Sequence, residues 1–304
     1  MGGGRSGAGN TIIEPMSTTT TAPTTHSPET PVPALPRRAR AWWLSPWSWL
    51  LGAILAVVVL APWLAPYDPT LQLPGGLTDS GQPLPPGPGH WLGTDDLGRD
   101  VLSRLLHGGR MSLFIAGLAT LVTGLIGVTL GIVAGYGGGK VDNAVMRLTE
   151  IVMAFPGLLL AIALASVLPH GPFSVVVTLS IVGWTSLARI VRGSVLAIRE
   201  QEFIDASYAL GANHLRVLVH HVWPNVRALA LTLLGLKLAD MLLLEAALGF
   251  LGLGVAPPTP TWGGLVAEGK NYFYQAPWLG LPAGVGIFLT VLSVNMIAER
   301  WGKK

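Results

Sequence analysis

Residues 111–136 read MSLFIAGLATLVTGLIGVTLGIVAGY, and no charged side chain interrupts them. The hydrocarbon core of a bilayer is about 30 Å thick, so a helix needs roughly 20 apolar residues to cross it. Inside lipid, the backbone donors and acceptors must find partners within the protein, and a helix provides them from its own segment. The stretch therefore predicts a membrane-spanning helix.

The same pattern recurs along the chain, and it predicts an all-α integral membrane protein with six transmembrane helices. The five further candidate spans are residues 42–64, 148–168, 173–198, 228–253 and 278–298. Pro156 and Pro282 fall inside two of these spans, and a kink is expected at each proline.

The composition agrees with a protein that has the bilayer as its solvent. Half of the 304 residues are hydrophobic and only 12% are charged, and the mean hydropathy is +0.54. The formal charge of +3 comes from basic residues at the ends of apolar stretches, which indicates membrane topology and not nucleic-acid binding. The sequence has no cysteine, which excludes disulfides, thiol catalysis and cysteine-ligated metals.

Basic residues also predict the orientation of the spans. They precede the first span, follow the sixth, and lie in the second-to-third and fourth-to-fifth connections: Arg37, Arg38, Arg40, Lys140, Arg147, Arg199, Arg216, Arg227, Arg300, Lys303 and Lys304. The positive-inside rule then places both termini in the cytoplasm. Residues 65–110 and 254–277 become outer loops, and residues 199–227 become a cytoplasmic segment.

Residues 1–40 differ in composition from the rest of the chain. They are rich in glycine and then in Thr, Pro and Ser, which predicts a disordered cytoplasmic tail ahead of a six-span domain at 41–304. A signal peptide is the alternative. The first apolar segment is long for one, and no small-residue cleavage site precedes Pro66, so an uncleaved anchor is favoured. Met16 is an alternative to Met1 as the first residue.

The cytoplasmic segment 199–227 reads REQEFIDASYALGANHLRVLVHHVWPNVR. Helical spacing predicts a helix from about residue 202 to 210, ended by Gly211, and a second helix capped by Asn213. Such a pair in the cytosol must lie on the membrane or dock on another protein, and its charges of both signs favour a protein. The residues predicted on one face of the first helix are Phe203, Ala206, Ser207 and Leu210.

This segment resembles the EAA loop of ABC importer permeases, the coupling helix that fits a groove on the ATP-binding subunit. The triad stands as Asp205, Ala206 and Ser207, followed by Gly211; it departs from the family pattern at its first and third positions. Trp223 also replaces the usual leucine before the proline. The resemblance implies contacts with the ATP-binding subunit from Glu202, Phe203, Asp205, Ala206, Ser207, Leu210, Gly211, Ala212, Pro224 and Asn225.

Two further stretches are similar to signatures of the second permease of dipeptide, oligopeptide and nickel importers, the DppC/OppC type. They are residues 90–113, HWLGTDDLGRDVLSRLLHGGRMSL, and 244–264, LEAALGFLGLGVAPPTPTWGG. The resemblance covers about residues 42–300 and implies a type I ABC importer permease in a bacterial or archaeal cell membrane. It also implies a heterodimer with a homologous permease, two ATP-binding subunits that hold ATP and magnesium, and an extracytoplasmic solute-binding protein.

The outer segment 92–110 carries acids just ahead of a predicted helix start, where they suit the helix dipole. Helical spacing allows the pairs Asp96–Arg99 and Asp100–Arg104. Two interpretations remain open, an amphipathic helix on the outer membrane face and a docking site for the binding protein. The candidates for docking are Asp95, Asp96, Arg99 and Trp262.

The fifth span contains Lys237, Asp240 and Glu245. Each charge near the centre of a membrane helix costs about 2.5 to 3.5 kcal/mol, so the three must be sheltered from lipid. Lys237 and Asp240 are three residues apart and can pair, whereas Glu245 needs another partner. A structural pair in a subunit interface and a wall of the translocation path are the two interpretations.

Glycines repeat every fourth residue at Gly127, Gly131 and Gly135, which indicates close helix packing within the subunit or between subunits. The glycine run before Lys140 is not a phosphate-binding loop, because Ala134 and Val141 stand where glycine and Ser or Thr are required. No catalytic motif or histidine spacing typical of a metal site is present. The chain is therefore expected to be a transport subunit without an ATPase site or a bound cofactor.

A membrane enzyme and a self-sufficient channel or secondary carrier are the rival classes. The first would need catalytic side chains at one depth, and the second would be supported by an inverted internal repeat. Neither feature is found in the sequence. The transported solute stays open between dipeptides, oligopeptides and nickel chelates.

Overall fold

The computed structural model describes residue 2 and residues 45–302, and the latter belong to one compact unit. Apart from residue 2, the predicted tail at 1–40 lies outside the described residues. The described helices are α1 (Pro46–Val59), α2 (Ala61–Leu64), α3 (Val101–Gly137), α4 (Gly139–Met153), α5 (Gly157–Val167), α6 (Pro172–Arg199), α7 (Glu202–Ala209), α8 (His214–Val217), α9 (Trp223–Phe250), α10 (Trp262–Lys270) and α11 (Leu281–Gly302). A π-helical segment (Leu218–Val222) joins α8 to α9, and a short 3-10 turn (Pro277–Leu279) precedes α11.

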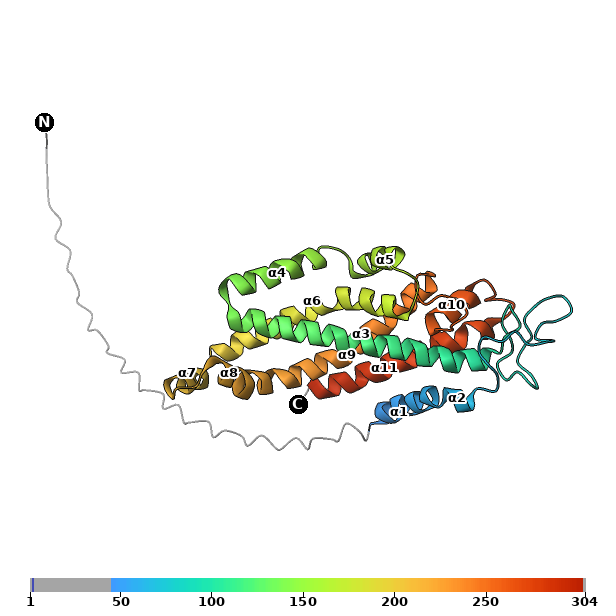
Figure 1. The fold of residues 1–304 in the computed structure, drawn as a ribbon, viewed down its shortest axis with the longest axis horizontal. Coiled ribbons are helices and arrows are strands. Elements are labelled where there is room, and N and C mark those ends of the chain that lie inside the picture. The colour runs from blue at the N-terminus through green and yellow to red at the C-terminus, as the bar shows by residue number, and fades with distance from the viewer. Residues whose placement is uncertain (1, 3–44, 303–304) are drawn as a thin grey trace. The chain divides into compact units, whose positions relative to one another are not determined.

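Within residues 45–302 the structure contains helices and loops but no named strand, as the all-α prediction requires. Figure 1 shows α3, α6, α9 and α11 running side by side, with α1 beside α11. The pair α7 and α8 lies at one end of this bundle. The helix α10 and the loops between α2 and α3 lie at the other end.

Among residues 45–302, three helical segments are long and apolar enough to cross a membrane: α3, α6 and residues 277–300 around α11. Helices α4 and α5 pass the same test together, as a pair bent by 84°. The expected spans at 42–64 and 228–253 correspond to α1 with α2 and to α9. Helix α1 is apolar but only 14 residues long, and α9 contains the charged residues Lys237, Asp240 and Glu245.

Some boundaries differ from the expected ones for reasons that are visible locally. Helix α3 begins at Val101 and not near residue 111, because the Asp100 carboxylate caps it by accepting from the Ser103 amide at 2.8 Å. The kink expected at Pro156 is confirmed as the break between α4 and α5. The kink expected at Pro282 is wrong, because this proline lies in the first turn of α11, where an amide hydrogen needs no helical partner.

The glycines of α3 allow its backbone to approach α6 closely. A Cβ atom at Gly127 would lie 2.8 Å from the Trp184 carbonyl oxygen, and one at Gly131 would lie 2.7 Å from the Ala188 carbonyl oxygen. One at Gly135 would lie 2.8 Å from the Cβ of Val195. Of the two interpretations, packing within the subunit is therefore the one that the structure confirms.

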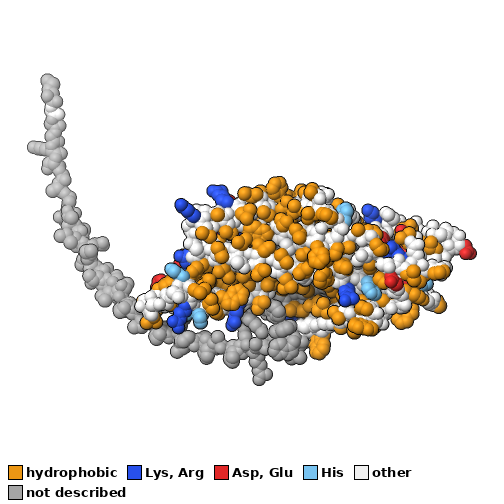
Figure 2. All heavy atoms as spheres, in the orientation of Figure 1, with side chains coloured by type: hydrophobic (Ala, Val, Ile, Leu, Met, Phe, Trp, Pro, Cys, Tyr) orange, Lys and Arg blue, Asp and Glu red, His pale blue; other side chains and the backbone are white. Residues whose placement is uncertain are grey.

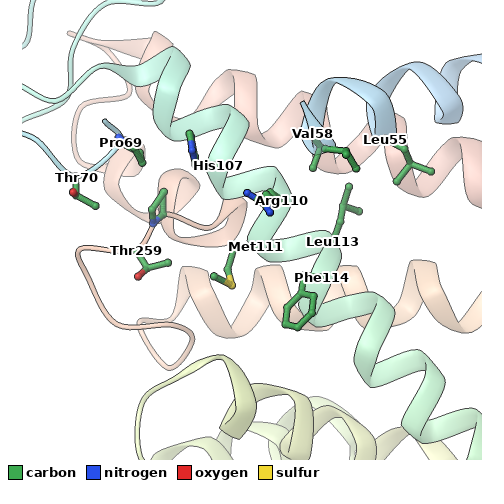
Figure 3. Close-up of a pocket in the computed structure, with 12 residues that line it drawn as sticks. Leu55, Val58, Pro69, Thr70, His107, Arg110, Met111, Leu113, Phe114 and Thr259 are labelled. Carbon is green, nitrogen blue, oxygen red and sulfur yellow. The ribbon is translucent and has the colours of Figure 1, made fainter. Parts of the chain in front are cut away.

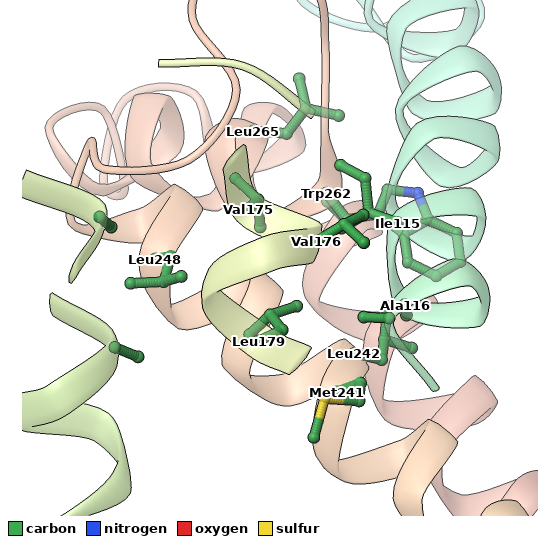
Figure 4. Packing of buried hydrophobic residues seen from close by; sticks show 14 of the residues in the cluster. Ile115, Ala116, Val175, Val176, Leu179, Met241, Leu242, Leu248, Trp262 and Leu265 are labelled. Atoms are coloured by element: carbon green, nitrogen blue, oxygen red, sulfur yellow. The ribbon is translucent and has the colours of Figure 1, made fainter. Parts of the chain in front are cut away.

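The largest core cluster forms where α3, α6, α9 and α10 meet, as Figure 4 shows. Ile115, Leu179, Met241 and Leu242 are each 1% exposed or less, and the ring of Trp262 closes the cluster at 3%. Lipid tails are as apolar as these side chains, so close packing provides the stabilisation here more than removal from water does. The cluster fixes α10 and the outer loops against the bundle.

The surface of the bundle is divided into an apolar middle and two charged ends. Figure 2 shows hydrophobic side chains over the middle of the face in view, with Lys and Arg gathered at the end that carries α7 and α8. Charges of both signs reappear over the outer loops. This is the distribution expected of a bundle that meets lipid in its middle and water at both ends.

Candidate functional site

The segment after α6 forms a tight helical hairpin whose local form matches the sequence prediction. Helix α7 ends at Ala209, and Gly211 follows with a φ of +85°. The amides of Gly211 and Ala212 donate to the carbonyls of Tyr208 and Ser207 at 2.9 and 3.0 Å. Asn213 caps α8 by accepting from the Arg216 amide at 2.8 Å. The predicted helix, its glycine terminus and the asparagine cap are all confirmed.

The second half of the hairpin differs from the prediction of a separate short helix. Helix α8 continues through the π-helical segment directly into α9. Pro224 lies in the first turn of α9 and cannot donate an amide hydrogen, which interrupts regular bonding at this point. The Asn225 side chain instead donates to the His221 carbonyl at 2.6 Å. One continuous helical path therefore leads from the hairpin into the membrane-spanning part of the chain.

A small cluster of apolar side chains packs the hairpin against the bundle. Ile204 of α7 is 2% exposed and belongs to a cluster with Val217, Val222 and Val226, and with Val195 of α6. These residues place one side of α7 in a shared apolar cluster with α6 and with the continuous path of α8, the π-helical segment and α9. A displacement of α7 would therefore be passed on to α6 and α9.

Two tyrosines add a polar contact that the sequence did not reveal. The hydroxyls of Tyr136, at the end of α3, and Tyr208, on α7, lie 2.7 Å apart. The Tyr136 hydroxyl also donates to the His214 carbonyl at 3.0 Å. The side chain of Arg199 donates to the Gly135 carbonyl at 3.0 Å, so α3, α6 and the hairpin meet at one point. A tyrosine at the end of an apolar span was the signal available in the sequence.

The other side of the hairpin presents apolar side chains to solvent. Phe203 is 44% exposed, Leu210 89% and Leu215 68%. Ala206 and Asp205 are exposed as well, whereas Ser207 is half-buried and donates to the Phe203 carbonyl at 2.7 Å. The remaining predicted contact residues are Glu202, Gly211 and Asn225, which are exposed, and Ala212 and Pro224, which are half-buried.

At the opposite end, a buried ion-pair network holds together the predicted outer loops, residues 65–110 and 254–277, which we call the outer lobe. The Arg99 Nε atom lies 2.6 Å from an Asp95 carboxylate oxygen, and the Arg104 Nε atom lies 3.3 Å from the same oxygen. The Arg104 guanidinium also donates to both oxygens of Glu268, at 2.7 and 2.9 Å. Burial raises the pKa of the Glu268 carboxyl above its usual value, although the charges of Arg104 and Arg99 act in the opposite direction.

This network corrects two predictions about the outer segment. The expected pairs Asp96–Arg99 and Asp100–Arg104 are wrong, because Arg99 pairs with Asp95 and the Asp100 carboxylate caps α3. Asp95 and Arg99 are also buried, at 1% and 5% exposure, so they are not surface contacts for a binding protein. Asp96 is half-buried and keeps some exposed surface.

Trp262, the fourth docking candidate, is buried as well. Its backbone amide donates to the Ser112 hydroxyl and its indole nitrogen donates to the Leu105 carbonyl, both at 3.0 Å. These bonds tie the start of α10 to α3 across the core. The residue holds the outer lobe in place and is not part of the surface.

The charges of α9 separate into a pair and a lone carboxylate. The Lys237 ammonium lies 3.1 Å from an Asp240 oxygen, as predicted. Glu245 is 1% exposed, forms no ion pair within residues 45–302, and has the Ser112 hydroxyl as the polar group close to its carboxylate. Because Glu245 lies deep inside the subunit, it is not placed on an open path in this structure.

Apolar cavities flank α3 on both halves of its length. Figure 3 shows one of about 640 Å³ between α1, α3 and two outer loops, with His107 and Arg110 among its lining residues. A second, of about 830 Å³, lies between α3 and α9 and is lined mainly by aliphatic side chains. Both are open on one side, as expected of a bundle that meets lipid or another subunit.

Comparisons with known proteins agree with this geometry. The chain is 40% identical over 257 residues to the di/tripeptide transport system permease protein DppC of Pseudomonas aeruginosa, covering 82% of this chain and 84% of the relative. It is 38% identical over 251 residues to the oligopeptide transport system permease protein OppC of Bacillus subtilis, covering 82% and 80%. The glutathione transport system permease protein GsiD of Pectobacterium atrosepticum is 35% identical over 246 residues, with 81% and 80% covered.

A solved structure of the MetNI methionine ABC transporter in an inward-facing conformation shares the fold. The TM-score is 0.54 at 19% identity, over 66% of this chain and 94% of the other. A family model described as the binding-protein-dependent transport system inner membrane component matches residues 127–303, which include the hairpin and α9 to α11. The chain belongs to the family of inner membrane components of binding-protein-dependent transport systems.

Proposed function

We propose that this chain is the permease subunit of an ATP-binding-cassette importer for dipeptides or oligopeptides. The names of its relatives support peptides as the solute, since two of them are permeases for di/tripeptides and for oligopeptides. A nickel chelate or another small solute is the alternative within the same family. The chain forms half of the translocation path, and a homologous permease forms the other half.

The proposal includes six membrane spans with both termini in the cytoplasm. The spans are α1 with α2, α3, α4 with α5, α6, α9 and α11. Four of them are supported by length and apolar composition. For α9, the Lys237–Asp240 pair reduces the cost of its charges, and Glu245 is sheltered inside the subunit. The hairpin of α7 and α8 then lies on the cytoplasmic side.

The observation that carries the proposal is the exposed apolar face of this hairpin. Leu210 exposes 89% of its surface and Leu215 68%, and the same hairpin carries the exposed charged residues Glu202 and Asp205. A mixed apolar and charged helix end, anchored on its other side by Ile204, is suited to a protein groove. We assign this face to the ATP-binding subunit, which holds ATP and magnesium.

The anchoring contacts suggest how the motion of the ATP-binding subunits reaches the membrane. A displaced α7 pulls on α6 and α9 through the Ile204 cluster and on α3 through the Tyr136–Tyr208 contact. The continuous path from α8 into α9 transmits the same displacement without a flexible loop. Rigid-body movement of this kind can open the paired permeases alternately to each side.

The outer lobe is proposed to receive the extracytoplasmic solute-binding protein. Its buried network of Asp95, Arg99, Arg104 and Glu268 keeps the loops between α2 and α3 fixed against α10. A rigid lobe is a suitable platform, while the docking contacts themselves belong to exposed side chains such as Trp91, at 79% exposure.

Charge reversal at Asp205 tests the assignment of the hairpin. An Asp205→Arg variant is expected to insert normally but to co-purify poorly with the ATP-binding subunits or to lose ATP hydrolysis stimulated by the binding protein. Reversal of charge at a desolvated contact costs several kcal/mol, whereas a solvated surface acid changes stability by less than about 0.5 kcal/mol. The matched control is Asp79→Arg, at an exposed acid in the outer loop.

Both assembly and stimulated hydrolysis should be measured on the same preparations. Normal values for Asp205→Arg would place this residue outside the interface. Poor co-purification of Asp79→Arg with the ATP-binding subunits as well would show a general effect of added positive charge, and the hairpin would lose its assigned role.

A further inference from the structure

A polar cavity of about 500 Å³ lies between α4 and α6, in the part of the bundle on the side of the hairpin. Its lining residues are Asp142, Asn143, Met146, Glu150, Arg189 and Arg192. Four of these six side chains carry a charge, in contrast to the apolar cavity of Figure 3. Pockets of about 300 to 1,000 Å³ accommodate small ligands, so a short peptide fits in size.

One ion pair forms the fixed wall of this cavity. The Arg192 guanidinium donates to both carboxylate oxygens of Asp142, with a distance of 2.6 Å from Nη2 to Oδ2. This two-bond geometry satisfies both groups and joins α4 to α6. The pair leaves Arg189 and Glu150 as the charged side chains that can bind something else.

Arg189 has no hydrogen-bond or ion-pair partner within residues 45–302, and its side chain is exposed. It lies about 26 Å along the axis of α6 from Pro172, at 1.5 Å per residue, and thus within one hydrocarbon thickness of that end. Near the cytoplasmic edge of the hydrocarbon layer, a charged side chain avoids lipid by reaching the interface or a water-filled cavity. The polar cavity supplies that environment.

Glu150 is held only weakly by the chain itself. Its carboxylate lies 3.2 Å from Arg147, and the two side chains are 56% and 82% exposed. An exposed pair of this kind is readily exchanged for another partner. The acids in the cavity also disfavour a lipid phosphate as its occupant, because the cytoplasmic leaflet is anionic.

A ligand that carries both a negative and a positive group fits this arrangement best. We propose that the cavity is a station on the translocation path, where Arg189 binds the terminal carboxylate of a peptide and Glu150 binds its ammonium group. The inference rests on the proposed function and names the groups of the substrate that this chain would contact. The planar guanidinium matches a carboxylate with two parallel hydrogen bonds. Exposure of both side chains keeps binding weak enough for release.

The test uses the complete importer with its partner subunits, reconstituted in vesicles. Uptake of tri-alanine is compared for the unchanged chain, Arg189→Gln, Arg189→Lys and the control Lys140→Gln, which removes an exposed cation outside the cavity. Arg189→Gln is expected to lower uptake at least about tenfold, and Arg189→Lys is expected to restore part of it. Lys140→Gln should transport as the unchanged chain does.

A second measurement distinguishes binding from a structural role. The chain has no cysteine, so an Asn143→Cys variant offers a single thiol in the cavity wall for a water-soluble reagent. Tri-alanine should slow its labelling, and the protection should disappear when Arg189→Gln is added. Unchanged uptake in Arg189→Gln, or labelling that the peptide does not slow, would overturn the proposal. An unaltered importer that carries a nickel chelate and no peptide would instead overturn the proposed function.

Discussion

Replacing Gly211 by valine perturbs the turn of the hairpin without removing any contact. The residue has a φ of +85°, and a Cβ atom placed on it would meet nothing within 4 Å. The effect is therefore backbone strain alone. For a residue with a side chain, the left-handed conformation costs about 1 to 2 kcal/mol, and β-branched residues are the least compatible with it.

A strain of this size is large for a short helical hairpin. Since 1.4 kcal/mol is a factor of ten in an equilibrium, the native turn should become roughly five- to thirty-fold less favoured. Helix α7 has only eight residues and depends on its tertiary contacts, so it can rearrange locally while the membrane-spanning helices stay folded. Transport and stimulated ATP hydrolysis should both decrease, with normal membrane insertion.

The assay compares Gly211→Val with Gly211→Asn and with Gly81→Val. Asparagine tolerates the left-handed conformation and should remain close to the unchanged chain. Gly81 has a φ of +74° and also has open space around it, but it lies in the outer loop, so Gly81→Val applies a matched strain far from the hairpin. Wild-type coupling in Gly211→Val would refute the reasoning, as would an equal loss in Gly211→Asn, while Gly81→Val controls for the effect of the same strain on membrane insertion.

Three further predictions concern the stability of the outer lobe and the topology. Arg104→Met should destabilise the chain by about 3 to 5 kcal/mol, because it leaves the buried Asp95 and the carboxylate of Glu268 without their partner. The control Arg147→Met, at an exposed pair, should cost about 1 kcal/mol or less. Comparable thermal unfolding of the two variants would contradict this prediction. Trp262→Ala removes a ring that is 3% exposed and should lower stability by about 3 to 5 kcal/mol. If its unfolding temperature shifts no more than that of Trp91→Ala, a variant at an exposed tryptophan, the packing described would be contradicted. Single cysteines that replace Ser80 and Thr259 should react with an impermeant reagent from outside, and those that replace Asn213 and Lys304 should stay unlabelled. The reverse pattern would overturn the orientation.

Local features of this chain were predictable from sequence with good accuracy. The expected span at 173–198 corresponds to α6 at 172–199, and the turn at Gly211 and the cap at Asn213 have the predicted forms. In each case the determining interactions lie within a few residues: an apolar run, a residue that tolerates positive φ, and a side chain that accepts from a nearby amide.

The outer network was not predictable because its partners are far apart in sequence. Arg104 pairs with Glu268, 164 residues later, and spacing along one helix cannot reveal such a contact. The Tyr136–Tyr208 contact, across 72 residues, escaped for the same reason. Burial of Asp95 and Arg99 reversed their interpretation, since charged residues in an outer loop are ordinarily taken as surface groups.

The start of α9 shows a different limit of prediction from sequence. A second short helix and a span beginning at residue 228 were expected as separate elements, but Pro224 fits the first turn of α9, and the preceding π-helical segment keeps the path continuous. Only the backbone geometry distinguishes the two outcomes. The continuity matters for function, because it makes α9 a direct extension of the hairpin.

The most direct test of the account is ATP-driven uptake by the reconstituted importer. Vesicles that contain this chain, the homologous permease and both ATP-binding subunits should accumulate labelled tri-alanine when the binding protein is outside and ATP is inside. Accumulation should stop when ATP, the binding protein or this chain is omitted. Uptake that continues without ATP, or without the ATP-binding subunits, would contradict the claim that this chain is a permease driven by partner ATPases.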